Sequence, residues 1–150
     1  MTVTTSSGPS LASIGVNVAG SNDDISFSNT TISGFGTGIQ MEGGDLYLGG
    51  TSQARSSSGV LIVADGYGVD AEDVDIIVNG ATVDVSDTNG IGISSASSSG
   101  LHDLDLTDLS TDGDVGLLTD KHKEFRWNGG TSTSDTTLKT INTASGSIEN

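Results

Sequence analysis

The feature that most constrains the fold of this chain is a glycine followed by a large apolar residue, which returns at intervals of a few tens of residues. Successive apolar residues of this step are separated by 23, 30, 22 and 26 positions. They are Val16, Ile39, Val69, Ile91 and Leu117. Spacings in this range are typical of stacked repeats, in which one unit buries its apolar face only when a neighbouring unit covers it.

Between these glycine steps, apolar and polar residues alternate at period two. Val74, Ile76 and Val78 form one such run, and the Asn-Gly pairs at 79–80 and 89–90 follow or precede similar runs. Alternation of this kind is the pattern of a strand with one buried face, and Asn-Gly is a turn dipeptide. Each repeat is therefore predicted to hold two or three short strands and no helix.

The segment from Asp24 to Ile39, DISFSNTTISGFGTGI, combines the short strands, the small polar turns and the repeat length. It resembles one coil of the right-handed parallel β-helix of pectate-lyase-like proteins and of viral tailspikes and fibres. The resemblance covers about residues 11–120 and implies an all-β fold of about five coils with polar N- and C-terminal arms. The alternative is an antiparallel β-sandwich of the same strands, because alternation does not reveal strand direction.

Composition along the chain suggests three segments. Residues 1–10 are rich in Thr and Ser and are predicted to form an extended N-terminal arm, residues 11–120 the β-helix body, and residues 121–150 a C-terminal cap and tail. The Gly- and Ser-rich stretch between 42 and 58 accounts for the longest spacing. It is either a projecting loop or a plain flexible turn.

The charge is strongly acidic: 20 Asp and Glu against five Lys and Arg, a formal charge of −15 on 15.1 kDa. In dilute buffer such a charge opposes a compact fold, whereas at molar salt the Debye length falls to about 3 Å and the repulsion largely disappears. The surplus of Asp and the scarcity of Lys resemble proteins of extreme halophiles. An acidic surface protein from an ordinary habitat is the alternative.

Most of the basic charge lies in the C-terminal segment, next to the single Trp. Phe125 and Trp127 would share one face of an extended segment and cap the open end of the apolar stack, or bind a partner or a glycan. Nucleic acid is an unsuitable partner, since the acidic body repels phosphate. The predicted partner-binding residues are Lys121, Lys123, Phe125, Arg126 and Trp127.

The resemblance to pectate-lyase-like proteins implies either a carboxylate-bound Ca²⁺ with a basic residue as base, or a pair of Asp. Arg55 is the one basic residue of the body and has no acidic neighbour in sequence, so we expect no enzymatic activity and no cofactor beyond loosely bound Na⁺, K⁺ or Ca²⁺. His102 and His122 are isolated in sequence and are expected to be solvated. The weak candidates for a metal site are Asp70, Asp73, Asp112 and Asp114.

The chain has no Cys, no apolar run of 18 residues and no basic, apolar start typical of a signal peptide. We therefore expect no membrane insertion. A rod of five coils is short, so a homo-oligomer is expected, a trimer above all. These points favour a non-enzymatic structural protein of a virion surface appendage (capsid turret, head decoration or tail fibre) of a virus of a halophilic archaeon, in contact with other virion proteins. The alternative is an extracellular carbohydrate-binding or carbohydrate-active β-helix protein, and a cell-surface glycan would then be a partner.

Overall fold

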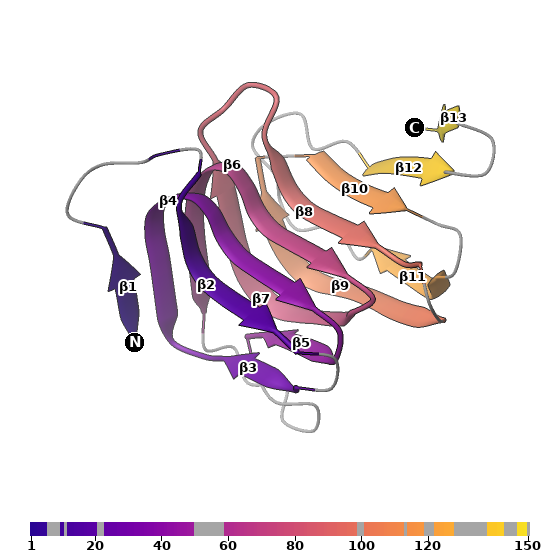
Figure 1. The fold of residues 1–150 in the computed structure, drawn as a ribbon, viewed down its shortest axis with the longest axis horizontal. Coiled ribbons are helices and arrows are strands. Elements are labelled where there is room, and N and C mark those ends of the chain that lie inside the picture. Colours follow the sequence, from indigo (N-terminus) through magenta and orange to yellow (C-terminus); the bar gives the residue numbers. More distant parts are fainter. Residues whose placement is uncertain are drawn as a thin grey trace.

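The computed structural model describes residues 1–5, 10, 12–20, 23–49, 59–98, 101–112, 114–118, 122–127, 138–142 and 147–149. Within these ranges the chain forms thirteen β-strands and no helix (Figure 1). The strands are β1 (Thr2–Thr4), β2 (Ile14–Ala19), β3 (Ile25–Phe27), β4 (Thr30–Glu42), β5 (Asp45–Leu48), β6 (Val60–Glu72), β7 (Asp75–Val85), β8 (Ile91–Ala96), β9 (His102–Thr111), β10 (Asp114–Leu118), β11 (His122–Trp127), β12 (Leu138–Asn142) and β13 (Ser147–Glu149). The described part of the chain thus holds no helix of the length and apolar character needed to cross a membrane.

The strands stack into three parallel sheets that wind around one core. The first sheet contains β1, the first parts of β4 and β6, and the last parts of β7 and β9. The second contains β2, the last parts of β4 and β6, then β8, β10 and β12. The third contains β3, β5, the first parts of β7 and β9, and β11.

Every strand pairing is parallel except the terminal one between β12 and β13. The chain is therefore a parallel β-solenoid of about four turns, which confirms the predicted all-β, β-helix fold and excludes the antiparallel sandwich. Figure 1 shows the coils following one another from β1 and β2 at one end to β10 and β12 at the other.

The register along the second sheet corrects part of the predicted repeat. Val16 lies beside Ile39 and Ile39 beside Val69, as predicted, but Val69 lies beside Ile93 and Ile93 beside Val115. The predicted equivalents Ile91 and Leu117 were each wrong by two residues. A shift of two keeps a residue on the same face of a strand, so alternation alone could not detect the error.

The core consists of Val, Ile and Leu stacked over residues of the same kind in the next coil. Large apolar side chains from all three sheets have no exposed surface. They include Ile32, Ile62 and Val83 from the first sheet, Ile39, Val69, Ile93 and Val115 from the second, and Leu46, Ile76 and Leu106 from the third. Branched aliphatic side chains suit this arrangement, because each covers the one above it without interrupting the parallel backbone.

A column of glycines marks the bend from the first sheet to the second. A Cβ added at Gly15 would lie 2.7 Å from the carbonyl oxygen of Gly38, and one added at Gly38 would lie 2.6 Å from that of Gly68. The same Cβ positions would meet Ile32 beside Gly15, Ile62 beside Gly38 and Val83 beside Gly68. These positions carry glycine because the carbonyl of the next coil and a core side chain already fill the space.

Both predicted arms contribute strands to the stack. Thr2–Thr4, expected in an extended arm, pair with Thr31–Ser33 as β1 and so belong to the first coil. β11, which lies beyond the predicted end of the body at residue 120, continues the third sheet in parallel with β9. The Gly- and Ser-rich segment 50–58 lies outside the described residues.

We predict that Gly38→Ala lowers the free energy of unfolding by about 1–3 kcal/mol, the usual cost of forcing extra volume into a packed site. The loss should appear as a lower midpoint of thermal or denaturant unfolding. Gly116→Ala is the matched control, because a Cβ there would meet only Ile91, at 3.8 Å. Equal midpoints for the two variants would contradict the role given to the glycine column.

Candidate functional site: an acidic corner of the solenoid

An acidic concave surface lies where the second sheet bends into the third. The turns that follow β2, β4, β6 and β8 stack there and border a cleft of about 730 Å³. We call its ionisable residues the acidic corner; they are Glu42, Asp45, Glu72, Asp73, Asp75 and His102. Five carboxylates thus face one cleft.

The acidic corner repeats like charges from coil to coil. Glu42 lies beside Glu72 in the parallel register, and Asp45 lies beside Asp75. Neighbouring strands are about 4.8 Å apart, a distance at which like charges directly opposite each other are destabilising. The backbone holds these coils together across the corner, since Gly43 N–H donates to the Glu72 carbonyl and Asp75 N–H to the Gly44 carbonyl.

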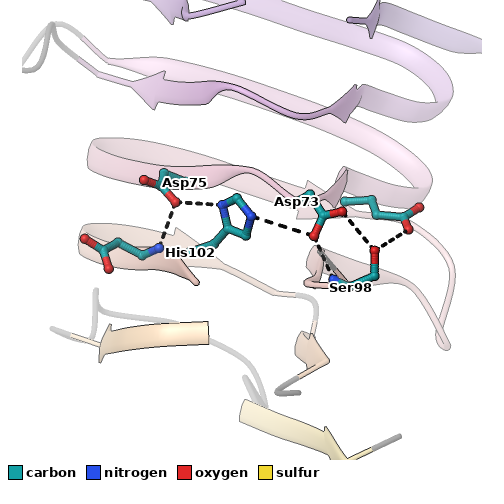
Figure 2. A network of polar contacts seen from close by, with 6 residues as sticks. Asp73, Asp75, Ser98 and His102 are labelled. Atoms are coloured by element: carbon teal, nitrogen blue, oxygen red, sulfur yellow. Dashed lines mark hydrogen bonds and ion pairs between the residues drawn. The ribbon is translucent and has the colours of Figure 1, made fainter. Parts of the chain in front are cut away.

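His102 lies between two of the carboxylates (Figure 2). Its Nδ1 is 2.9 Å from Asp75 Oδ1, and its Nε2 is 3.7 Å from Asp73 Oδ1. The Asp75 oxygen also accepts a hydrogen bond from the backbone N–H of Asp103, at 2.9 Å. His102 therefore joins the turn between β6 and β7 to the start of β9, one coil later.

Asp73 holds the turn after β8 to the same corner. Its backbone is left-handed, with φ of 55°, and its own N–H donates to the Ala96 carbonyl at 2.8 Å. Its carboxylate accepts the Ser98 N–H at 2.7 Å and the Ser98 hydroxyl at 2.8 Å. The hydroxyl of Ser98 thus donates to Asp73 rather than to His102, so these residues do not form the serine–histidine contact that activates a nucleophile.

Tyr47 adds a hydrogen bond at the edge of the corner. Its hydroxyl donates to Asp45 Oδ2 at 2.8 Å. This hydrogen bond, together with partial burial and the charges of Asp45, Asp24 and Asp75, raises the pKa of Tyr47 to about 12. The phenol consequently stays protonated and helps to hold the Asp45 carboxylate of the acidic corner in place.

A second carboxylate pair lies at a different bend, between the first and second sheets. Burial raises the pKa of Asp84, and the nearby charge of Asp112 raises it further. Asp112 Oδ1 also accepts the N–H of Val85 at 2.7 Å, and the Ser86 hydroxyl bonds to Asp65. Carboxylates on this bend therefore serve as acceptors that fasten one coil to the next.

The structure places the four predicted metal candidates apart. Asp73 belongs to the acidic corner, whereas Asp70 lies in the second sheet between Gln40 and Ser94. Asp112 lies on the other bend, and of Asp114 the structure describes the backbone, beside Ile91. Within the described ranges, no group of three or more His, Cys, Asp or Glu side chains is arranged to hold a metal ion.

Four of the five predicted partner-binding residues lie in β11, the last strand of the third sheet. Lys121 is outside the described residues, and Lys123 lies in β11. The backbone register places Phe125 beside Leu104, Arg126 beside Asp105 and Trp127 beside Leu106. Capping of the stack by Phe125 and Trp127 stays a prediction.

The sequence reading of His102 as an isolated, solvated residue was wrong, because two carboxylates from the preceding coil flank it. The signal was present in the spacing: Asp75 and His102 are 27 residues apart, about one coil. This spacing could not be recognised in the sequence, because the coil length varies. Which residues of successive coils meet at a corner is known only once the strand register is known.

No protein-family model matches the sequence, and neither the curated proteins nor the solved structures contain a chain similar enough to count as a match.

We predict that Asp45→Asn lowers the pKa of Tyr47 from about 12 toward its ordinary value of 10.0. The pKa in the folded state is the higher one, so the protonated phenol contributes stability that is complete below pH 10 and is lost as the pH rises toward 12. The phenolate absorbance of Tyr47 measures this in a Tyr67→Phe background, since the chain has two tyrosines. If the titration midpoint of Tyr47 is the same with and without Asp45→Asn, the hydrogen bond to Asp45 is contradicted.

We also predict that Glu72→Gln stabilises the fold at low salt by about 0.5 kcal/mol, because it removes one of two opposed carboxylates. At molar salt the gain should disappear, since screening already suppresses the repulsion. Asp70→Asn is the matched control: it removes the same charge from between the neutral residues Gln40 and Ser94. Unfolding midpoints that rise equally in both variants would indicate an effect of net charge and would contradict a specific repulsion between Glu42 and Glu72.

Proposed function

We propose that this chain is a non-enzymatic structural module that acts by assembling with other copies or with a larger particle. One observation carries the proposal: the apolar residues of the first coil are only partly covered. Val3, Val16, Val18 and Ile25 pack against the core but keep exposed surface, whereas their counterparts one coil inward are at most 1% exposed. A stacked-repeat protein normally closes its ends with polar capping units, and this end lacks one among the described residues.

The second part of the proposal is that the assembly works in concentrated salt. The opposed carboxylates of the acidic corner add to a net charge of −15, and both are tolerated best where ions screen them. The hydrogen bonds that the carboxylates accept from Ser98, Val85 and Asp103 support a structural use of these groups. Carboxylates that fasten coils together are not available as a free acid–base pair.

Within this proposal, the setting we favour is the surface of a virion of a halophilic archaeon, as a turret, head decoration or tail fibre in contact with other virion proteins. The parallel β-solenoid supports it through the likeness to viral tailspikes and fibres, and the acidic composition supports the saline habitat. The sequence alone suggests a homotrimer, whereas the partly covered first coil favours association through the end of the stack.

Carbohydrate binding is the second candidate function. It is supported by Tyr67, which is 40% exposed on β6, and by the acidic cleft, whose carboxylates suit sugar hydroxyls as acceptors. Loss of glycan binding in a Tyr67→Ala variant with an unchanged unfolding midpoint would favour this function.

We predict that the purified chain is an oligomer at molar salt. Light scattering or sedimentation should give a mass that is a multiple of 15.1 kDa and that falls as salt is removed. A single 15.1 kDa species at all salt and protein concentrations would contradict self-assembly.

A further inference from the structure

The outer edge of the first coil carries no further strand from the described part of the chain. Among the described residues, β1 and β2 pair only with β4, and β3 pairs only with β5. The apolar side chains behind this edge are incompletely buried, in contrast to their register partners Ile32, Ile39, Met41 and Leu46. Figure 1 shows this end on the left, with β1, β2 and β3 ahead of the coils that follow.

Two of the three edge strands, β1 and β2, carry no charged side chain, and the first carboxylates come directly before β3, at Asp23 and Asp24. Residues 1–22 contain no Asp, Glu, Lys or Arg, and the first of the 20 acidic residues of the chain is Asp23. Natural sheet edges are usually protected by Lys, Pro or a bulge. β2, with the sequence IGVNVA and an uninterrupted register to β4, has none of these.

The outward hydrogen-bonding groups of β2 follow from its pairing. The carbonyl of Ser13 accepts the N–H of Thr37 at 2.9 Å, so the polar groups of Ser13 face β4. Along a parallel strand the side to which these groups point alternates with each residue. The N–H and C=O of Ile14, Val16 and Val18 therefore face away from β4, toward the open end.

We propose that this end binds the same end of a second copy of the chain, with β2 of one copy antiparallel to β2 of the other. The inference rests on the proposed role in assembly and names its surface and its partner. A second copy is the partner that the charge favours: two chains of −15 repel each other, and contact centred on the uncharged strands β1 and β2 leaves Asp23 and Asp24, before β3, as the carboxylates nearest to it. Contact would cover Val3, Val16, Val18 and Ile25, and pair the outward backbone groups.

A two-fold axis that is perpendicular to the stack and passes between the two β2 strands pairs all three edge strands of each copy at the same time. It reverses β2 onto its own copy and exchanges the first and third sheets, so β1 of one copy lies antiparallel to β3 of the other. Both strands are three residues long. The chain advances by one strand spacing per coil along the axis of the stack. Relative to β2, β1 therefore lies about one third of a spacing farther out and β3 about one third of a spacing farther in. The axis that brings the two β2 strands to about 4.8 Å therefore brings each β1–β3 pair to the same spacing.

Asn17→Asp is the first test. Asn17 is exposed near the centre of β2, so the substitution opposes two carboxylates near the axis of the dimer. We expect the dissociation constant, measured by sedimentation at low salt, to rise at least about fivefold, and the effect to shrink at molar salt. Gln40→Glu is the control for an added charge one coil inward, since Gln40 is the register partner of Asn17. This control adds the same charge away from the edge and should change the constant by less than about twofold. Gln40 also lies beside Asp70, so the unfolding midpoint of this variant is measured as well, to separate the cost of the new carboxylate pair from any change in association.

Ile14→Pro is the second test. Ile14 is 37% exposed and its N–H faces outward, so proline removes an edge donor while keeping the hydrogen bonds to β4. We expect weaker association at every salt concentration, with the unfolding midpoint of the monomer, measured in dilute solution, close to that of the unchanged chain.

The outcomes separate this inference from the proposed function. A wild-type dimer that both edge variants dissociate supports it. An oligomer of any size that neither variant weakens, or that Gln40→Glu weakens as much as Asn17→Asp, overturns the edge interface and leaves self-assembly standing. A wild-type chain that stays monomeric in molar salt overturns both.

Discussion

The structure depends on one constraint: in a parallel solenoid each residue lies beside its counterpart one coil away, at the strand spacing of about 4.8 Å. A side chain of one kind, whether apolar or charged, therefore tends to face the same kind of side chain in the next coil. At core positions this repetition is favourable, because Ile39 covers Val69 and Val69 covers Ile93, and none of the three has exposed surface. The glycine column obeys the same constraint, since a side chain at one coil would occupy the carbonyl position of the next.

At the corners the same repetition is unfavourable. Glu42 beside Glu72 and Asp45 beside Asp75 are like charges held at strand spacing by a backbone that cannot separate them. The fold moderates the repulsion with donors: His102 lies between Asp73 and Asp75, Ser98 donates to Asp73, and the phenol of Tyr47 donates to Asp45. These donors act on single carboxylates, whereas screening by salt acts on all of them at once.

The sequence contained most of the fold and little of the site, for a physical reason. Period-two alternation and recurrent glycine steps report which face of a strand is buried, so the β-helix and the first repeats, Val16 to Ile39 to Val69, could be predicted. They do not report register to better than two residues, which is why Ile91 and Leu117 were chosen in place of Ile93 and Val115. The acidic corner joins residues about one coil apart, such as Asp75 and His102, and an uncertain coil length hides such pairs.

At the two ends of the stack a coil has a neighbouring coil on one side alone. The surface of these ends therefore determines whether the solenoid can associate with another molecule. An inner coil has strands paired on both sides, while on the outer side of the first coil the described residues form no strand and its apolar residues are partly buried. Most carboxylates of the chain lie on later coils, and β1 and β2 of the first coil carry none; Asp23 and Asp24 precede β3. Salt that screens the corners also reduces repulsion between copies, while burial of apolar surface does not weaken with screening. Conditions that reduce repulsion within the fold would therefore also favour the association proposed for this end.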